Sequence, residues 1–269
     1  APAFKDFMAG IRPHATLASP ATMLEQAEAG LNRDVPMFKP SPAHSRVALI
    51  VGGGPSLWRE WPNLRKHITR GGDVYSLNGT HDWLILRGVG PDVHVCLDAR
   101  ADNAQFFTMP HREVTYLIAA QCHAEVYQAL DGYQVTQWVA HAPGIEKLCE
   151  KFQHKPICVV GGGETVGLKA ILLAYMAGYR KIRLFGFDSS YEGEEGHAYP
   201  QELNNNERVI DVEYNGKMFR SALWMARQAE QFAEEFGKMA RAGCRIYVHG
   251  DGLIPFMYRE LTQADEKVA

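Results

Sequence analysis

Residues Val159–Tyr199 decide the fold; they read VVGGGETVGLKAILLAYMAGYRKIRLFGFDSSYEGEEGHAY. Three glycines separate a short apolar run from an apolar segment that predicts a helix, beginning near Glu164 or Thr165 and stopping at Gly178. A second apolar run predicts a strand over Ile182–Phe187. A glycine turn, a helix and a buried strand in this order are typical of α/β proteins with a parallel sheet.

The same stretch predicts a binding site. The turn Gly161-Gly162-Gly163 leads into a helix whose first N–H groups are unpaired and whose dipole is positive at that end, so a phosphate can approach closely. Polar side chains follow the predicted strand directly, at Asp188, Ser189, Ser190 and Tyr191. Ligands of open parallel sheets bind at the carboxyl ends of the strands. We therefore expect an anion-binding turn and a polar cluster at the same edge of the sheet.

An earlier segment repeats this pattern. Arg46–Val51 is a continuous apolar run, typical of a strand buried on both faces, and it is followed by Gly52, Gly53, Gly54, Pro55 and Ser56. The turn is not a GxGxxG motif, because Leu57 takes the place of the last glycine, and it is not a Walker A loop, because no Gly-Lys-Ser/Thr follows. Nucleotide binding is the favoured interpretation; the alternative is a tight turn that needs glycine for packing.

Strands and helices alternate along the rest of the chain. The further predicted strands are Asp73–Leu77, Asp92–Leu97, Val114–Ala119, Tyr133–Ala140, Ile157–Val160 and Cys244–Val248. The further predicted helices are Trp61–Thr69, Asp82–Arg87, Ala124–Leu130, Lys217–Ala242 and Pro255–Leu261. This alternation predicts a single Rossmann-like α/β domain over residues 46–269, in which helices flank a mostly parallel sheet.

Two segments depart from this alternation. Residues 1–45 predict an N-terminal helical and irregular arm, with a short helix at Ala21–Leu31 followed by three prolines. We expect the arm to be a surface segment or the contact of a homo-oligomer. Pro200–Glu213 is polar and irregular, which is typical of a lid over a site or of a surface loop.

Composition restricts the class of protein. The chain has 269 residues, a net charge of −3 and a calculated pI of about 6.4, so no overall positive field indicates nucleic-acid binding. Its five cysteines show no CxxC spacing, which argues against a zinc site or a disulfide framework. No signal peptide and no apolar stretch of bilayer length stand out, so we expect a cytoplasmic protein without a membrane span.

Two more polar residues stand at predicted strand ends. Asn78 follows the second strand, where it could bind a base or a ribose, and the alternative is a turn asparagine. Asp98 follows the third strand, where a carboxylate could meet a metal or a hydroxyl group, and the alternative is a helix cap.

Three segments carry a resemblance to a known family. Val51–Leu57, Gly90–Asp98 and Gly163–Tyr199 resemble the family named after the archaeal 6-hydroxymethylpterin diphosphokinase, which includes the central domain of the motility-associated-factor (Maf) flagellin glycosyltransferases. The two glycine regions are also similar to those of bacterial lipooligosaccharide sialyltransferases. The resemblance covers roughly residues 46 to 248.

The resemblance implies roles for the residues at these positions. The first turn, from Gly52 to Ser56, would hold nucleotide phosphates, and Asn78 would lie near the nucleotide or the acceptor. Residues Gly162, Gly163, Glu164 and Thr165 would form a second wall. The transferred group or the nucleotide would contact Asp188, Ser189 and Tyr191.

The chain departs from both relatives. The sialyltransferases carry a catalytic histidine in a lid before their final helix, but the matching segment here, Glu213–Phe219, has none; His197 and His249 lie elsewhere. The pterin kinase pattern has a carboxylate-rich turn after the third strand, where this chain offers Asp98 and Asp102.

The leading hypothesis is a transferase that uses a sugar nucleotide of the cytidylyl type, without a tightly bound cofactor. His197, and after it Asp188, are the candidates for the general base that deprotonates the acceptor. Tyr191 and Tyr199 are the candidates for donating protons to the phosphate, and the alternative is that they pack as buried tyrosines.

Two alternatives remain open. One is Mg²⁺-dependent transfer of pyrophosphate from ATP to a pterin-like hydroxymethyl group, with Asp98, Asp102 and Asp188 as candidate metal ligands. The other is a non-catalytic nucleotide-binding module that uses its arm for assembly.

Overall fold

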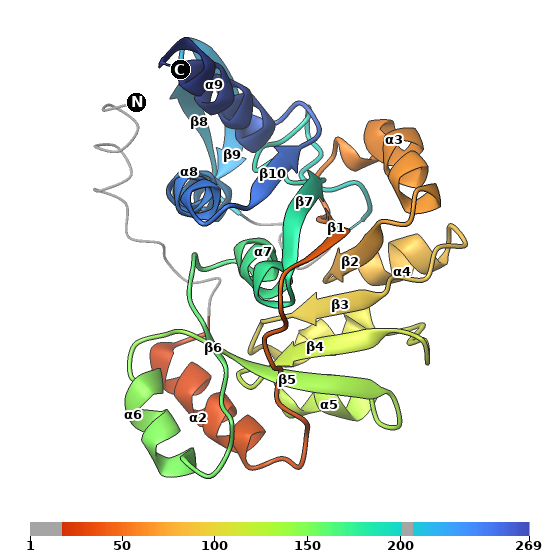
Figure 1. Ribbon diagram of the computed structural model, residues 1–269, viewed down its shortest axis with the longest axis vertical. Helices are drawn as coiled ribbons and strands as arrows, with labels where there is room; N and C mark the ends of the chain where they lie inside the picture. Colours follow the sequence, from red (N-terminus) through yellow and green to blue (C-terminus); the bar gives the residue numbers. More distant parts are fainter. Residues whose placement is uncertain (1–17, 201–206, 269) are drawn as a thin grey trace.

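The computed structural model describes residues 18–200 and 207–268, which form one twisted sheet with helices on both faces (Figure 1). All neighbouring strands of the sheet pair in parallel. The strands are β1 (His44–Val51), β2 (Asp73–Leu77), β3 (Val93–Cys96), β4 (Thr115–Ala119), β5 (Gln134–Ala140), β6 (Val159–Val160), β7 (Tyr179–Phe185) and β10 (Arg245–Val248). The predicted Rossmann-like α/β fold is confirmed.

The strands lie in the order β10-β7-β1-β2-β3-β4-β5-β6, so the direction in which successive strands are added across the sheet changes once. From β1 the chain steps outward strand by strand to β6, and then it returns to place β7 on the other side of β1. In the register, Val51 at the end of β1 lies between Ser76 of β2 and Phe185 of β7. Such a reversal opens a crevice at the carboxyl ends of the two central strands, where open α/β sheets bind their ligands.

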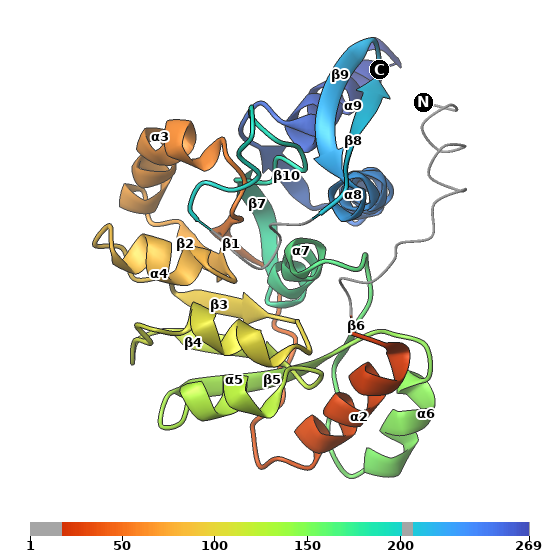
Figure 2. The same ribbon diagram turned by 180° about the vertical axis from the view of Figure 1, so that it is seen from behind.

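The helices cover the two faces of this sheet. They are α2 (Pro20–Leu31), α3 (Leu57–Thr69), α4 (Thr80–Ile85), α5 (Ala124–Ala129), α6 (Ile145–Cys149), α7 (Val166–Met176), α8 (Leu223–Arg241) and α9 (Leu253–Val268), with short 3₁₀ turns at Ala101–Phe106 and Glu150–Phe152. Seen from behind, α3, α4 and α5 lie along the sheet, while α8 and α9 gather beyond its β10 end (Figure 2). No helix in these described ranges is both long and apolar enough to cross a bilayer.

Alternation along β1 separates the two layers of the core. Leu49 and Val51 belong to a cluster with Leu57 and Leu64 of α3. Ile50 points to the opposite face and belongs to the larger cluster under α7 and α8. This is the pattern expected of a central parallel strand, which is buried on both faces.

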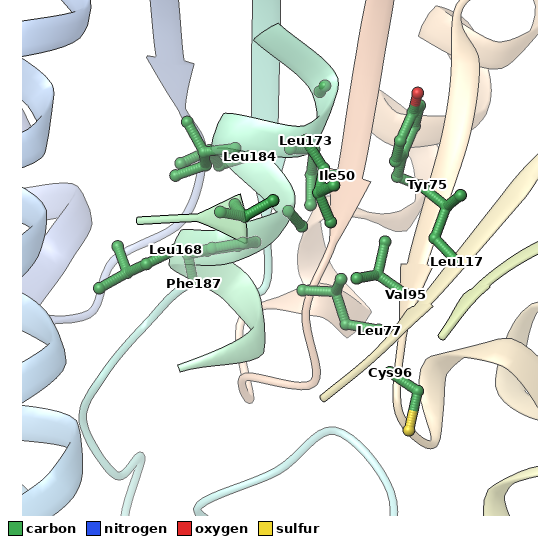
Figure 3. Close-up of a cluster of buried hydrophobic side chains, with 14 of the residues drawn as sticks. Ile50, Tyr75, Leu77, Val95, Cys96, Leu117, Leu168, Leu173, Leu184 and Phe187 are labelled. Atoms are coloured by element: carbon green, nitrogen blue, oxygen red, sulfur yellow. The ribbon is translucent and has the colours of Figure 1, made fainter. Parts of the chain in front are cut away.

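Helix α7 carries the crossover from β6 back to β7, so it lies across the middle of the sheet. Its sequence, VGLKAILLAYM, is apolar nearly all round, as expected for a helix packed between a sheet and another helix. Figure 3 shows its Leu168 and Leu173 in one cluster with Ile50 of β1 and Leu184 of β7. The glycine turn that precedes α7 is therefore fixed on a rigid element.

The segment before α8 differs from the sequence prediction. Val209–Tyr214 (β8) and Lys217–Ala222 (β9) form an antiparallel hairpin, and α8 begins at Leu223. The predictions of an irregular Pro200–Glu213 and of a helix from Lys217 are therefore wrong in this part; residues 201–206 lie outside the described ones. The turn is Asn215-Gly216, with φ values of 46° and 77°, the two-residue pattern that favours hairpins. This Asn-Gly signal, flanked by alternating VIDVEY, was present in the sequence.

The N-terminal segment packs against the β5 end of the sheet. Ala27 and Leu31 of α2 are fully buried with Val139 of β5 and Ile145 of α6. The backbone approaches so closely that a Cβ atom on Gly30 would lie 2.2 Å from the carbonyl oxygen of Ala120. Residues of the segment 18–45 therefore form part of the hydrophobic core. The other residues of the predicted arm, 1–17, lie outside the part of the chain that the structure describes.

Candidate active site

A cavity of about 460 Å³ lies at the carboxyl ends of the central strands, at the reversal of strand order. The structure brings twelve of the predicted site residues together around it: Gly52, Gly53, Gly54, Asn78, Asp98, Gly163, Glu164, Thr165, Asp188, Ser189, His197 and Tyr199. Five other candidates do not line it: Pro55, Ser56, Asp102, Gly162 and Tyr191. Sites of this size and position commonly bind small molecules and cofactors.

The first glycine turn is bound tightly to the neighbouring strand. Its amide groups already have acceptors within the protein: Gly52 N donates to Phe185 O (2.8 Å), Gly54 N to Gly186 O (2.8 Å), Ser56 N to Asp188 Oδ2 (2.9 Å) and Leu57 N to Gly54 O (3.1 Å). Pro55 has no N–H group. Within the described part of the chain, Gly53 therefore holds the amide of this turn that is left for a ligand. The expected phosphate cradle at this turn lacks most of its donors.

Asp188 holds three loops together beside this turn. It is only 2% exposed, and its Oδ2 accepts the hydrogen bond from Ser56 N. Added Cβ atoms on Gly54 and Gly252 would lie 2.2 Å and 2.5 Å from its side chain, so both glycines are needed for its packing. Burial raises the pKa of the Asp188 carboxyl. The geometry gives this carboxylate a positioning task, because it joins the ends of β1, β7 and β10.

Two of the polar residues in the wall of the cavity combine an unpartnered oxygen with a strained backbone. Asn78 and Ser189 both have positive φ values, 47° and 50°, which non-glycine residues rarely adopt. Asn78 Oδ1 and Ser189 Oγ are buried and find no hydrogen-bond partner among the described residues. Backbone strain and unsatisfied polar atoms both cost stability, and they concentrate where a ligand compensates for them.

The segment 196–199 covers the first glycine turn. Ala198 N donates to Gly53 O (2.9 Å), and Trp58 Nε1 donates to Ala198 O (2.6 Å). A Cβ atom on Gly53 would lie 2.6 Å from the Tyr199 hydroxyl and 3.3 Å from Cδ2 of His197. Burial lowers the pKa of His197 to about 4 and raises the pKa of Tyr199. At neutral pH the cavity therefore holds a neutral imidazole and a protonated phenol.

The second glycine turn differs from the first in its surroundings. Gly162 and Gly163 adopt φ values of 67° and 69°, which require glycine. Thr165 caps α7, since its hydroxyl accepts from Leu168 N (3.4 Å). Glu164 N donates to Gln231 Oε1 (3.0 Å). Residues Gly163–Gly167 line the cavity, and the amides of Val166 and Gly167 have no acceptor among the described residues, so they are available to a ligand.

Lys169 is a site residue that the sequence analysis did not select. It lies in the wall of the cavity, is 3% exposed, and donates through Nζ to Val160 O (2.8 Å) and Gly161 O (3.0 Å). Burial lowers its pKa to about 8, against the opposing effect of Glu235 and Glu164. The signal in the sequence was a lysine in the first turn of a helix that follows three glycines.

The candidate metal ligands are not brought together. Asp98 is engaged by Arg100, whose backbone N and Nε donate to its two oxygens at 3.0 and 2.9 Å. Asp102 lies 4.0 Å from the same Nε and does not line the cavity. Asp188 follows β7, which β1 and β2 separate from the end of β3 where Asp98 lies. No group of three or more His, Cys, Asp or Glu side chains in the described ranges is arranged around a possible metal position. The donor set proposed for Mg²⁺ therefore does not fit.

Helix α8 contributes a polar wall that the sequence analysis missed. Trp224, Arg227, Gln228 and Gln231 recur at helical spacing and all line the cavity. The Trp224 indole donates to Glu207 Oε2 (2.6 Å), and Arg227 lies 3.8 Å from the Glu164 carboxylate. All four residues lie inside the helix that the sequence predicted from Lys217, so the polar positions three and four residues apart were a signal for this wall.

Tyr191 does not line the cavity. Its backbone N donates to Arg220 O of β9 (2.8 Å), and its ring would be 3.0 Å from a Cβ atom on Gly196. Its side chain therefore supports the loop between β7 and the hairpin, and the structure does not bring it to the cavity with His197.

The fold is that of a Rossmann-like α/β protein, with a cavity at the switch point of its sheet. A sequence model of the family described as 6-hydroxymethylpterin diphosphokinase MptE-like matches residues 21–194. The chain belongs to this family, and the match includes helix α2. No curated protein matches the chain.

Solved structures of other proteins are similar to this chain, and the first of the two described next supports the fold. A MAf glycosyltransferase from Magnetospirillum magneticum AMB-1 is 18% identical, with a TM-score of 0.67 over 87% of this chain and 37% of that one. A mammalian sialyltransferase in complex with Gal-beta-1-3GalNAc-ortho-nitrophenol is 9% identical, with a TM-score of 0.42 over 93% of this chain and 86% of that one. At these identities the likeness concerns the fold alone. The chain spans little more than a third of the MAf protein.

Proposed function

We propose that this chain is a nucleotide-dependent transferase that moves a glycosyl group from a sugar nucleotide of the cytidylyl type to an acceptor bound in the same cavity. The observation that carries the proposal is the junction of two glycine turns, a helix N-terminus and a buried lysine around one cavity at the switch point. The glycosyltransferase named among the similar structures supports the choice of glycosyl transfer. The cytidylyl donor follows from the resemblance of the two glycine regions to sialyltransferases.

The leaving phosphate binds at the second glycine turn in this proposal. The N-terminal amides of α7 and the Lys169 ammonium both supply positive charge there. In the first turn, by contrast, most amides already donate hydrogen bonds within the protein. Negative charge develops on the nucleotide phosphate as the glycosyl bond breaks. Fixed donors in a partly buried site stabilise that charge without reorganising.

His197 is the general base of the proposed reaction. Its imidazole is neutral at physiological pH, so it has a free lone pair for the acceptor hydroxyl proton. A base with a pKa of about 4 is weak, but the negative charge of a bound donor phosphate raises the pKa of a nearby imidazole. The Tyr199 hydroxyl, which stays protonated, donates a hydrogen bond to the donor. Asp188 positions the first turn and takes no proton.

Pyrophosphoryl transfer from ATP is the second candidate, and the description of the family favours it. Such a reaction requires Mg²⁺ to bridge the phosphates. Because Asp98 is paired with Arg100 and lies apart from Asp188, the residues present offer no ready ligand set for that ion. A binding module without turnover is the third candidate.

A thermal-shift series with CMP, CDP, UDP, GDP, ATP and AMP, each with and without Mg²⁺, distinguishes these candidates. A ligand that binds only the folded state raises the melting temperature by mass action. We expect CMP or CDP to raise it without metal. A rise with ATP that requires Mg²⁺ would move the assignment to pyrophosphoryl transfer, and no rise with any nucleotide would overturn both enzymatic proposals.

Turnover requires a separate measurement. Hydrolysis or transfer from CMP-sialic acid should be lost in His197→Ala while CMP still raises the melting temperature. Retention of full turnover in His197→Ala would show that another group is the base. A wild-type protein that binds CMP but consumes no cytidylyl sugar with any acceptor would leave the binding module as the remaining candidate.

A further inference from the structure

A second cavity, of about 450 Å³, lies at the opposite end of the central strands. It is lined by the first residues of β1, β7 and β10 and by the C-terminal end of α3, whereas the candidate active site lies at the carboxyl ends of the strands. We call it the basic cleft, because five cationic side chains line it: Arg46, Arg70, Lys181, Arg183 and Arg245. Its lining includes no Asp or Glu.

The strand register places like charges directly beside one another. Lys181 of β7 pairs with Arg245 of β10, and in the next row Arg183 pairs with Tyr247. On neighbouring strands, side chains in register point to the same face, and two like charges there repel. Lys181 and Arg245 are both exposed, so water weakens the repulsion between them. The pair does not stabilise the fold.

Most of these cations lack counterions. Arg46 forms an ion pair with Asp73, and Arg183 donates to His249 Nε2 (3.2 Å) and lies 4.5 Å from the centre of the Tyr247 ring. Arg70, Lys181 and Arg245 have no carboxylate within ion-pair distance among the described residues. The chain as a whole is slightly acidic, so this concentration of positive charge is local.

The positive charge of the basic cleft also affects a histidine in its lining. His67 of α3 also lines the cleft. Its pKa is lowered by burial and, in addition, by the positive charges of Arg183, Arg70 and Lys66. The guanidinium groups therefore converge closely enough to disfavour a further positive charge.

We propose that the basic cleft binds a small, multiply charged phosphate anion. Unpaired arginines and a lysine in a concave wall are the donors that phosphate groups prefer, and Arg offers paired N–H groups in a fixed geometry. The volume matches that of sites for small molecules. The proposal does not depend on the reaction assigned to the other cavity.

Calorimetric titration with inorganic tripolyphosphate at low salt tests this. The double variant Lys181→Ala/Arg245→Ala should bind it about tenfold more weakly or worse, since two charge-assisted contacts are lost. The matched control Lys147→Ala/Arg112→Ala removes the same charge from exposed positions outside the cleft and should bind as the wild type does. The melting temperature of the cleft variant without ligand should be equal or higher, because a repulsion is removed. Equal affinity in cleft and control variants would overturn the proposal.

A second arm identifies the source of the phosphate. Sedimentation with phosphatidylcholine vesicles, with and without phosphatidic acid, tests a lipid headgroup. Capture that requires phosphatidic acid and is lost in the cleft variant assigns the same phosphate chemistry to a lipid. Binding of a single-stranded oligonucleotide, with no response to tripolyphosphate or to the vesicles, would overturn the proposal in favour of nucleic acid.

Discussion

The two glycine turns of this protein read almost alike but are built for different purposes. In the first, Gly52–Gly54, the glycines allow two backbones to touch: a Cβ atom on Gly54 would lie 2.8 Å from the Gly186 carbonyl oxygen, and the amides bond to β7. In the second, Gly161–Gly163, two glycines adopt positive φ values and the turn leads into α7, whose Val166 and Gly167 amides have no acceptor among the described residues. Glycine therefore meets a steric need in one turn and a conformational need in the other.

The two turns differ in their capacity to bind a phosphate. A glycine-rich turn after a strand indicates an anion site only if its amides are free. In the first turn they are engaged, and Asp188 places a carboxylate beside them. In the second turn a buried cation, Lys169, lies against the backbone.

The largest effect is expected for Gly54→Ala in the first turn. The new methyl group would lie 2.2 Å from Asp188 Oδ2 and 2.8 Å from Gly186 O. The carbonyl oxygen belongs to the backbone that follows β7, and the carboxylate can turn away only by losing its hydrogen bond from Ser56 N. We expect a loss of about 3 kcal/mol or more in the free energy of unfolding. Urea denaturation measures it. A variant as stable as the wild type would show that the two turns are not packed differently.

Lys169→Met should separate binding from folding at the second turn. The variant loses two hydrogen bonds but also the cost of a buried charge, so we expect the free energy of unfolding to change by less than about 2 kcal/mol. The affinity for CMP should fall about tenfold or more, because a cation beside the phosphate is lost. Lys238→Met, at an exposed lysine on α8, is the control and should leave CMP affinity unchanged. Unchanged CMP affinity in Lys169→Met would remove the lysine from the proposed phosphate site.

Acid should lower the free energy of unfolding through two buried histidines, His197 beside the first turn and His249 after β10. Burial lowers the pKa of His197 and of His249 to about 4, below the value of about 6.5 in an unfolded chain. The unfolded state therefore takes up these protons first as the pH falls. The free energy of unfolding should decrease between about pH 6.5 and pH 4, by at most about 1.4 kcal/mol per pH unit for each histidine.

His249→Asn provides the control for this pH dependence. It should reduce the slope by one proton, as measured by urea denaturation at several pH values in that window. An identical slope in the variant would mean that His249 titrates in the folded protein as it does in the unfolded chain.

The smallest effect is expected for Gly161→Ala in the second turn. A Cβ atom there meets nothing within 4 Å, and its φ is not in the left-handed region. We expect the free energy of unfolding to change by less than about 1 kcal/mol, with a slight gain from the less flexible unfolded chain. Urea denaturation beside Gly54→Ala gives the comparison directly. A loss as large as that of Gly54→Ala would contradict it.

The sequence predicted the architecture because each element carried its own signal. The apolar run of β1 and the glycine turn after it indicate a buried parallel strand with a site at its end. The long apolar segment of α7 indicates a buried helix. The β8–β9 hairpin was also readable, from Asn215-Gly216 between alternating residues, but the amphipathic pattern of the following helix took precedence. Twelve of the candidate site residues meet at the cavity because parallel strands end at one edge.

What each of those residues does was decided by tertiary structure. Which amides of Gly52–Gly54 are engaged depends on β7, which lies more than a hundred residues away in the chain, and the pairing of Asp98 with Arg100 depends on a side-chain conformation. The position of Tyr191 outside the cavity lining and the burial of Lys169 likewise arise from the folded chain, in which Tyr191 N donates to Arg220 O of β9. Local sequence sets strands, helices and turns through short-range sterics and hydrophobic periodicity, whereas hydrogen-bond partners and pKa values depend on neighbours that only the folded chain assembles.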